Sequence, residues 1–434
     1  MSLGVIAALT PSNWDIEILD ENIDTFHFID ADIVGLTALT SSVKRAYDIA
    51  NYYRKKGVPI IIGGIHVSMM PEEASHYADT VVIGEAESIW QTIIKDFENN
   101  ELKQFYHGKL QSLYDSPPQR LDLYSNKYGL GSLQTSRGCP MNCDFCSVHE
   151  FNGRKHRYRP LKDIVEEFKA IPQERIYIID DDFYGYGKKH AERTKNICKE
   201  FIKCNLNKQW YTFTSMNLAN DKEAIDLMYK SGCRMVLLGI ESEISEQLIA
   251  SGKQTNLKVG TENFEIVYKS FHEAGIAVLG SFIYGLETDT EESIRRRTDY
   301  FINSSIDCIQ PGMLTPLPGT KVFNKLKSEK RIFKNNFPND WEQFTFLNNT
   351  IIRDNFTNNE FTELMYEEWE RMFDIKVLKR KYIQTLKNTK SPSAAGWALS
   401  TNMHYRNAVF EGKKENYNFQ KLFKELTSIA LPYA

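Results

Sequence analysis

The chain has 434 residues, of which 42% are hydrophobic and 25% are charged. This length allows two or three domains with their own cores, and this composition excludes collagen-like and low-complexity proteins and argues against intrinsic disorder. The 53 Lys and Arg residues and 57 Asp and Glu residues leave a net charge of −4. Overall charge therefore gives no reason to expect a nucleic acid or an anionic membrane as the main partner, and we expect a small molecule or a protein.

Cysteine usage and the N-terminus indicate the compartment. The chain has seven cysteines, an odd number, and Cys139, Cys143 and Cys146 lie within eight residues. This pattern fits metal or redox chemistry better than the disulfide framework of a secreted protein. The first fifteen residues have no basic region before their apolar stretch, and no segment approaches the ~18 apolar residues of a membrane span. We predict a cytoplasmic protein that does not span a membrane.

Residues 15 to 98 alternate short apolar runs with amphipathic stretches. Continuous Val- and Ile-rich runs at 32–36, 58–62 and 80–83 are typical of strands buried on both faces, so they predict a Rossmann-like, doubly wound parallel sheet. Small or polar residues follow each run, at the edge where open α/β sheets bind ligands. These residues are Thr37, Thr40, Ser41 and Ser42 after the first run, Gly63 to His66 after the second, and Gly84 to Glu87 after the third.

The polar segment 99–128 contains a Pro-Pro pair and has no clear period, which is typical of a linker. Six strand-then-helix units follow, and they predict a partial (β/α)6 barrel of the TIM type, whose catalytic groups lie at the C-terminal ends of the strands. Residues 358–388 show one long helical pattern, followed by an irregular aromatic tail. We therefore predict a Rossmann-like domain (1–115), a linker (116–128), a partial barrel (129–345) and a small, mainly α-helical C-terminal domain (346–434).

The strongest chemical signal is the C-x3-C-x2-C run of Cys139, Cys143 and Cys146, on the loop after the first barrel strand. Thiolates are the usual ligands of iron–sulfur clusters, and a four-iron cluster normally takes four of them. With three, one iron stays open to a small molecule, as in a catalytic zinc site. A zinc knuckle is the alternative, and His149 is the only nearby candidate for its fourth ligand.

This run, in this position, resembles the radical S-adenosylmethionine superfamily, and the whole chain resembles its subclass with an N-terminal cobalamin-binding domain. The strand ends match in order: Ile179 to Phe183, Ser215 with Asn217, Leu238 to Ser242, Gly280 to Glu287, and Leu317 to Thr320. The resemblance implies that the three cysteines hold a [4Fe–4S] cluster and that reductive cleavage of S-adenosylmethionine yields a 5′-deoxyadenosyl radical. It implies S-adenosylmethionine contacts at Phe145, Asp181, Ser215, Asn217, Glu241, Ser242 and Gly285.

The resemblance also implies a cobalamin site on the N-terminal loops. Its residues are Thr37, Ser41, Gly63, Gly64, His66, Gly84 and Glu85. None of the nine histidines lies in the D-x-H-x-x-G motif that supplies a cobalt ligand in other cobalamin proteins. The match begins after the point where relatives have their first strand, so we expect a domain that lacks this strand. His66 has the alternative interpretation of a loop histidine bonded to backbone.

The resemblance implies a radical enzyme that uses cobalamin to methylate an unactivated carbon. The alternatives are radical cyclisation, oxidation or rearrangement, with cobalamin in another role or absent, and, outside enzymology, a cobalamin or redox sensor. We expect a small-molecule, lipid or peptide substrate and an electron donor such as flavodoxin or ferredoxin. In the basic segment 153–160, Arg157 or Arg159 is predicted to contact a carboxylate or phosphate group of a cofactor or substrate, unless the segment is a solvated loop.

Overall fold

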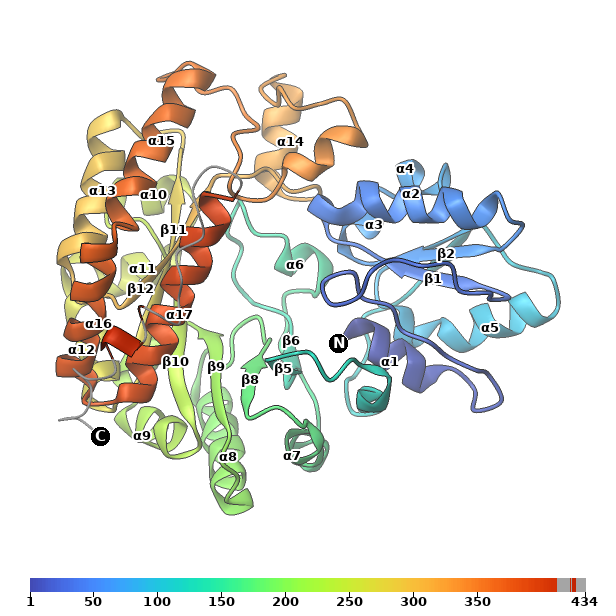
Figure 1. The fold of residues 1–434 in the computed structure, drawn as a ribbon, viewed down its shortest axis with the longest axis horizontal. Coiled ribbons are helices and arrows are strands. Elements are labelled where there is room, and N and C mark those ends of the chain that lie inside the picture. Colours follow the sequence, from blue (N-terminus) through green and yellow to red (C-terminus); the bar gives the residue numbers. More distant parts are fainter. Residues whose placement is uncertain (412–421, 423, 427–434) are drawn as a thin grey trace. The chain divides into compact units, whose positions relative to one another are not determined.

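The computed structural model describes residues 1–411, 422 and 424–426. The chain divides into two compact units. The first contains residues 1–141, 145–173 and 316–345, and the second contains residues 142–144, 174–315 and 346–434. Figure 1 shows the elements of both units.

The helices and strands have the following bounds. The helices are α1 (Ser2–Leu9), α2 (Val43–Arg54), α3 (Ile65–Met69), α4 (Pro71–Ser75), α5 (Trp90–Glu98), α6 (Val148–Phe151), α7 (Leu161–Ala170), α8 (Lys188–Cys204), α9 (Lys222–Lys230), α10 (Ser245–Ala250), α11 (Gln254–Val259), α12 (Phe264–Glu273), α13 (Glu291–Asn303), α14 (Lys321–Ser328), α15 (Asn358–Met372), α16 (Ile375–Thr389) and α17 (Pro392–Val409). The strands are β1 (Val34–Thr37), β2 (Ile60–Gly63), β3 (Thr80–Ile83), β4 (Phe105–His107), β5 (Gly131–Leu133), β6 (Ser136–Arg137), β7 (Arg157–Tyr158), β8 (Arg175–Ile178), β9 (Gln209–Thr214), β10 (Cys233–Glu241), β11 (Ala277–Tyr284) and β12 (Cys308–Met313).

The first unit is built on a parallel sheet in the order β1-β2-β3-β4. Helices α2, α3 and α4 lie on one face and α1 and α5 on the other, as Figure 1 shows, so the predicted doubly wound layering is confirmed. The apolar runs of β2 and β3 are buried, as expected for strands covered on both faces. Residues 15–20, which belong to the predicted alternation of apolar runs, form no regular structure.

The second sheet has six strands in the order β12-β11-β10-β9-β8-β5, which confirms the predicted partial barrel. Strands β8 to β12 pair in parallel. Side chains alternate between the two faces of a strand, and Met235 and Leu237 of β10 pack against Ala394 and Ala398 of α17. Helix α17 therefore covers one face of this sheet.

The C-terminal region is helical, as predicted, but the single helix expected over residues 358–388 is wrong. Two helices, α15 and α16, occupy this stretch, because the Asp374 side chain accepts a hydrogen bond from the backbone N–H of Lys376 and caps the start of α16. The tail was expected to be irregular, yet residues 392–409 form α17, which begins with Ser391 as its cap and Pro392 in its first turn. The rest of the tail lies largely outside the described residues.

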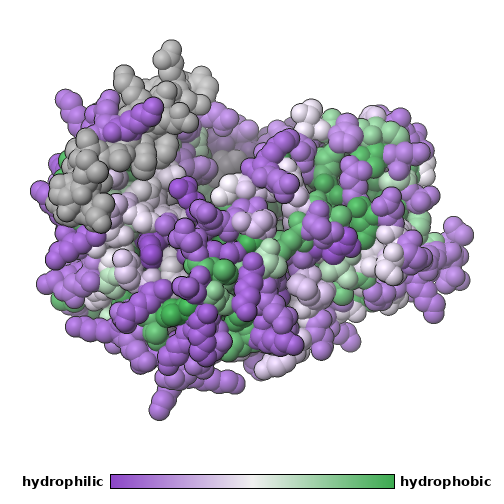
Figure 2. Space-filling view, turned by 60° about the horizontal axis from the view of Figure 1, so that its bottom comes forward, coloured by the Kyte–Doolittle hydropathy of each residue, from purple (hydrophilic) through white to green (hydrophobic). Residues whose placement is uncertain are grey.

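The surface gives no sign of a membrane span within the described residues, because no helix there is both long and apolar enough to cross a bilayer. On the face drawn in Figure 2, hydrophilic side chains are interspersed with smaller hydrophobic areas.

Candidate active site

The three cysteines of the C-x3-C-x2-C run are divided between the units. Cys139 and Cys146 belong to the first unit, Cys143 belongs to the second, and none forms a disulfide. Among residues 1–411, 422 and 424–426, no three His, Cys, Asp or Glu side chains are grouped as a metal site. Cluster ligation by these thiols therefore remains a prediction from their spacing, as does the contact made by the half-buried Phe145.

The backbone at the C-terminal end of β10 has an unusual conformation. Glu241 has φ +64°, a left-handed conformation that non-glycine residues rarely adopt, and a bulge displaces the pairing with β11 between Gly239 and Glu241. Bulges and strained residues often re-aim a side chain beside an active site. Here the carboxylate of Glu241 receives a hydrogen bond of 2.7 Å from the Nζ of Lys253.

The Glu241–Lys253 ion pair needs the space that Gly239 leaves. A Cβ atom at position 239 would lie 2.6 Å from the Glu241 Oε1 and 2.7 Å from the Lys253 Nζ. Asn256 of α11 donates to the carbonyl oxygens of Gly239 and Ile240, each at 2.9 Å, and so holds the strand end in place. A half-buried cation and a buried carboxylate thus lie side by side at this strand end.

Cys143 lies in the electrostatic field of this ion pair. The backbone N–H of Asp144 donates to the Ser251 carbonyl at 3.4 Å, which docks this part of the cysteine loop beside Lys253. Burial raises the pKa of the Cys143 thiol, the Lys253 charge opposes this rise, and the charges of Glu241 and Asp144 add to it. A cation that favours the thiolate suits a metal ligand, since the thiolate is the form that binds metals. Lys253 was missed in the sequence, although it follows the matched Gly-Ile-Glu-Ser element closely.

The ends of β8 and β9 bring two predicted residues, Ser215 and Asn217, into one polar cluster. Ser215 donates to Asp182 at 2.9 Å and also to the side-chain oxygen of Asn217, which in turn donates to the Gly185 carbonyl at 2.9 Å. Burial raises the pKa of Asp182. Asp181, the predicted contact, is half-buried, whereas its neighbour Asp182 is buried and carries these bonds. The buried hydroxyl of Thr214 has no hydrogen-bond partner within the described part of the chain, so a ligand group could satisfy it.

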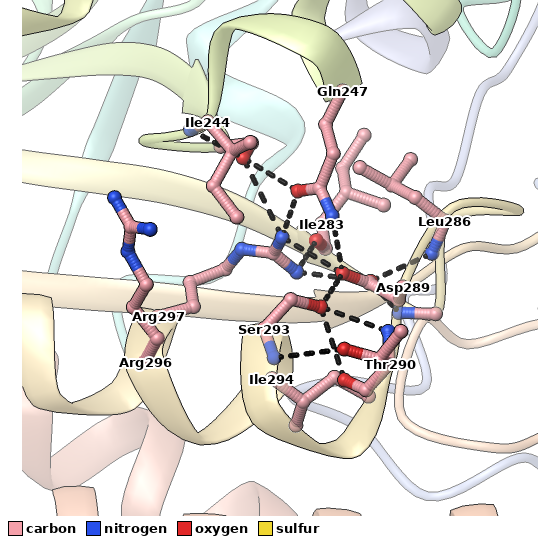
Figure 3. A network of polar contacts seen from close by, with 12 residues as sticks. Ile244, Gln247, Ile283, Leu286, Asp289, Thr290, Ser293, Ile294, Arg296 and Arg297 are labelled. Carbon is pink, nitrogen blue, oxygen red and sulfur yellow. Dashed lines mark hydrogen bonds and ion pairs between the residues drawn. The ribbon is translucent and has the colours of Figure 1, made fainter.

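A buried network links the ends of β10 and β11, and Figure 3 shows it around Asp289. Asp289 accepts from the backbone N–H groups of Gly285 and Leu286 at 2.8 and 2.9 Å, and Arg297 contacts both of its oxygens at 3.0 Å. Gln247 donates to Asp289 at 2.7 Å and accepts from Ser242 at 2.6 Å. Ser242 and Gly285 are thus brought together through α13, and the Ser242 hydroxyl is held inside this network. Their cofactor contacts remain predictions.

The loops of the first unit pack closely on one another. Gly64 has φ +108°, and a Cβ atom there would lie 2.9 Å from the Thr37 Oγ1, so the loops after β1 and β2 meet at a point that requires glycine. Thr37 is exposed, whereas Ser41 and Gly63 are half-buried. These positions stay predictions for the cobalamin site.

His66 is buried, and both of its ring nitrogens have partners. The Nδ1 lies 3.2 Å from the Thr40 hydroxyl, and the Nε2 lies 3.4 Å from Glu73. The ring packs edge-on against Trp341, whose indole N–H donates to Glu73 at 3.0 Å. The alternative interpretation named backbone as the partner of this loop histidine, but the partners are side chains. The bonds of His66 therefore favour a packing role.

The basic segment 153–160 is not a solvated loop at its two predicted arginines. Arg157 pairs with Glu85, and Arg159 pairs with Glu167 at 2.6 Å. Protein carboxylates thus form ion pairs with both guanidinium groups.

Comparison with known proteins identifies the family of the chain. The Radical SAM superfamily model matches residues 133–300, and the B12 binding domain model matches residues 3–94. The chain belongs to the radical S-adenosylmethionine superfamily. Within that superfamily, it belongs to the subclass with an N-terminal cobalamin-binding domain, so it is a radical enzyme with a [4Fe–4S] cluster, S-adenosylmethionine and cobalamin as cofactors.

Relatives of known name support this placement. Bacteriochlorophyllide d C-8(2)-methyltransferase of Chlorobaculum tepidum is 29% identical over 90% of this chain and 88% of its own length. Bacteriochlorophyllide d C-12(1)-methyltransferase of the same organism is 28% identical over 79% and 76% of the two chains. The structure of the methyltransferase TsrM from Kitasatospora setae, with cobalamin and a [4Fe–4S] cluster bound, shares the fold with a TM-score of 0.64 at 16% identity, over 86% of this chain and 88% of that one.

The residues of the second unit fit S-adenosylmethionine. Its methionine moiety is a zwitterion, and the Glu241–Lys253 pair offers one partner of each sign next to Cys143. In the first unit, the glycines at 64 and 84, each with positive φ, allow the close-packed loops that the cobalamin-binding family model covers.

Proposed function

We propose that the protein transfers a methyl group from S-adenosylmethionine to an unactivated carbon of a small molecule. The observation that carries this proposal is the ion pair of Glu241 and Lys253 beside the Cys143 thiol, in a chain that also matches the cobalamin-binding family. When bound, the cofactors supply a 5′-deoxyadenosyl radical, which removes hydrogen from the substrate, and a methyl group for transfer.

The protein side chains bind and orient in this scheme. Lys253 pairs with the carboxylate of S-adenosylmethionine, and Glu241 pairs with its amino group. Asp289 and Arg297 hold the turn at Gly285 and Leu286, and the family resemblance implies that Gly285 contacts S-adenosylmethionine. The turn at Gly285 and Leu286 is already in place before the ligand arrives, so this part of the site needs little reorganisation when the ligand binds.

We also propose an apolar, ring-containing substrate and an electron donor of the flavodoxin or ferredoxin type. The names of the relatives support the substrate class, since two are bacteriochlorophyllide methyltransferases and one is the hopanoid C-2 methylase of Rhodopseudomonas palustris, 26% identical over 76% of this chain. The nature of the cofactors supports the donor, because reductive cleavage needs an electron from outside the chain.

The experiment is to purify the chain without oxygen, load it with iron, sulfide and hydroxocobalamin, and supply S-adenosylmethionine labelled in its methyl group, with a reductant and candidate substrates. The expected result is a labelled product that forms together with 5′-deoxyadenosine and S-adenosylhomocysteine in equal amounts. The Cys143→Ala variant should release no 5′-deoxyadenosine.

A second candidate function is radical cyclisation or oxidation. Its support is the relative named anaerobic magnesium-protoporphyrin IX monomethyl ester cyclase of Rubrivivax gelatinosus, 23% identical over 79% of this chain. In this case 5′-deoxyadenosine forms with a converted substrate that carries no labelled methyl group, and this result would contradict the methylation proposal.

A further inference from the structure

One buried carboxylate of the first unit has two arginine partners on a single hairpin. Glu85 follows β3 in the cobalamin-binding domain, and its side chain is 3% exposed. Arg157 donates to both of its oxygens, at 2.6 and 2.7 Å, and Arg137 donates to one of them at 3.2 Å. The two-point geometry of the Arg157 contact is the strong form of this ion pair.

The two arginines directly oppose each other. Strands β6 and β7 form an antiparallel pair in which Arg137 is the partner of Arg157. Like charges in this position destabilise a pair of strands, and two strands of two residues each are marginal without further support. Glu85 supplies the negative charge that this pair requires, and Glu87 adds a second contact to Arg137 at 2.6 Å.

The hairpin leads directly into the predicted cluster loop. Gly138 follows β6, and its φ of +97° lets the chain turn against residue 155, where a Cβ atom would lie 2.3 Å from the Lys155 carbonyl oxygen. The backbone N–H of Cys139 then donates to the Gly153 carbonyl at 3.2 Å. The start of the cysteine run is thus set by the two segments that Glu85 joins.

The electrostatics of Glu85 agree with a permanent ion pair. Burial alone would raise its pKa, but the hydrogen bonds and charges of Arg157 and Arg137 lower the pKa below the usual value. The carboxylate therefore stays ionised between the two guanidinium groups, although it lies away from water.

We propose that Glu85 is a positioning residue that fastens the loop after β3 of the cobalamin-binding domain to the hairpin that opens the cluster loop. In this role, it neutralises two opposed arginines. The conformation of the cysteine run then depends on a carboxylate of the cobalamin-binding domain. The significance for the cluster rests on the proposed function, whereas the effect on the hairpin does not.

The first test is hydrogen–deuterium exchange of the full chain without iron or cobalamin. In Glu85→Gln, the amides of residues 134–158 should exchange about tenfold faster or more, because a buried ion pair is broken and two cations are left opposed. The amides of β2 and β3 should keep their wild-type rates. Glu101→Gln, an exposed acid of the same unit, is the matched control and should exchange as the wild type does.

The second test is rescue. Removal of one opposed cation in Glu85→Gln/Arg157→Gln should restore a substantial part of the protection that Glu85→Gln loses, which a residue that only fills space would not allow. Wild-type exchange in Glu85→Gln, equal acceleration in β2 and β3, or no rescue in the double variant would each overturn the proposal.

Reconstitution with iron and titration with hydroxocobalamin extend the test to the cofactors. Glu85→Gln should retain several-fold less iron per chain than the wild type and regain part of it in the double variant. Weaker cobalamin binding with an unchanged hairpin would mean that Glu85 contacts the corrin directly, and this would also overturn the proposal. If the wild type itself takes up no iron, the proposed function fails, whereas the exchange result still decides the role of Glu85.

Discussion

At the scale of single residues, the pair of Glu241 and Lys253 gives a test of stability that separates charge from packing. Lys253→Met leaves the Glu241 carboxylate buried without its cation, which costs about 3 to 5 kcal/mol for a buried pair. Adding Glu241→Gln removes the uncompensated charge and should recover most of this loss. Denaturant unfolding of both variants measures the effect, and Lys258→Met, an exposed lysine of α11, is the control. Equal destabilisation in the single and double variants would contradict an electrostatic role.

Lys381 makes the stability of the second unit depend on pH. Its amine is buried and donates to the carbonyl oxygens of Ser304 and Ile306, and burial lowers its pKa to about 7. Between pH 7 and the ordinary lysine value of about 10.4, the unfolded chain binds more protons than the folded chain, so this residue contributes more stability as pH rises.

The unfolding free energy of the wild type relative to Lys381→Met should therefore increase by about 1 to 3 kcal/mol from pH 7 to pH 9 and stay level below pH 6. Denaturant unfolding across this range measures it. Lys387→Met, on the exposed side of α16, should show no such trend. A difference that is flat from pH 6 to pH 9 would show that Lys381 is charged in the folded state.

The residues that sequence reasoning found and missed differ in one physical respect. The three cysteines belong to a local motif whose spacing predicts them, and Glu241 lies in a short element that resembles one of the family. Lys253 and the partners of Glu85 are defined by contacts between distant segments, and Arg157 lies 72 positions from Glu85. A sequence pattern cannot show which carboxylate a guanidinium meets, and the prediction that Arg157 binds a ligand therefore missed the protein's own Glu85.

At the scale of elements, the buried carboxylate of Asp289, just before helix α13, connects the ends of β10 and β11. Asp289→Asn removes the negative charge beside the buried Arg297 and weakens the bonds that fix Gly285 and Leu286. We expect a loss of stability of about 3 kcal/mol and a several-fold weaker affinity for S-adenosylmethionine. Isothermal titration of the cluster-loaded enzyme measures the affinity. Glu292→Gln, an exposed acid in the first turn of α13, is the control. Unchanged affinity for S-adenosylmethionine in Asp289→Asn would show that this network does not contribute to ligand binding.

The apolar pattern of the sequence predicts that a segment is helical but does not predict where each helix begins and ends. The apolar period continues across residues 358–388, so it predicts one helix. Asp374, however, caps a new helix with its side chain and interrupts the first, so a single cap decides the division into α15 and α16. Ser391 and Pro392 carry the same kind of signal for α17, and weighing them against the aromatic residues around them would have found this helix.

At the scale of the whole molecule, the order of parallel strands could be predicted because each strand is followed by its helix along the chain. Which segments of the chain belong to each unit could not be predicted. Residues 316–345 follow the last barrel strand in sequence but belong to the first unit, where Trp341 packs on His66 and donates to Glu73. This association depends on a hydrogen bond between the buried indole of Trp341 and the carboxylate of Glu73, which lies more than 260 positions away. No local sequence pattern predicts such a contact.

The division into units predicts that the two cofactor functions can be separated. The loops of Gly64 and Gly84 belong to the first unit, which has its own core around Ile61, Val82 and Trp90, whereas Cys143, unlike Cys139 and Cys146, belongs to the second. Cys143→Ala should therefore bind hydroxocobalamin within about twofold of the wild-type affinity while it releases no 5′-deoxyadenosine. Absorbance titration and product analysis measure the two properties, and Cys204→Ala, a thiol outside the run, should retain both. A parallel loss of cobalamin affinity in Cys143→Ala would show that the first unit needs the cluster to bind its cofactor, and that the two units act as one.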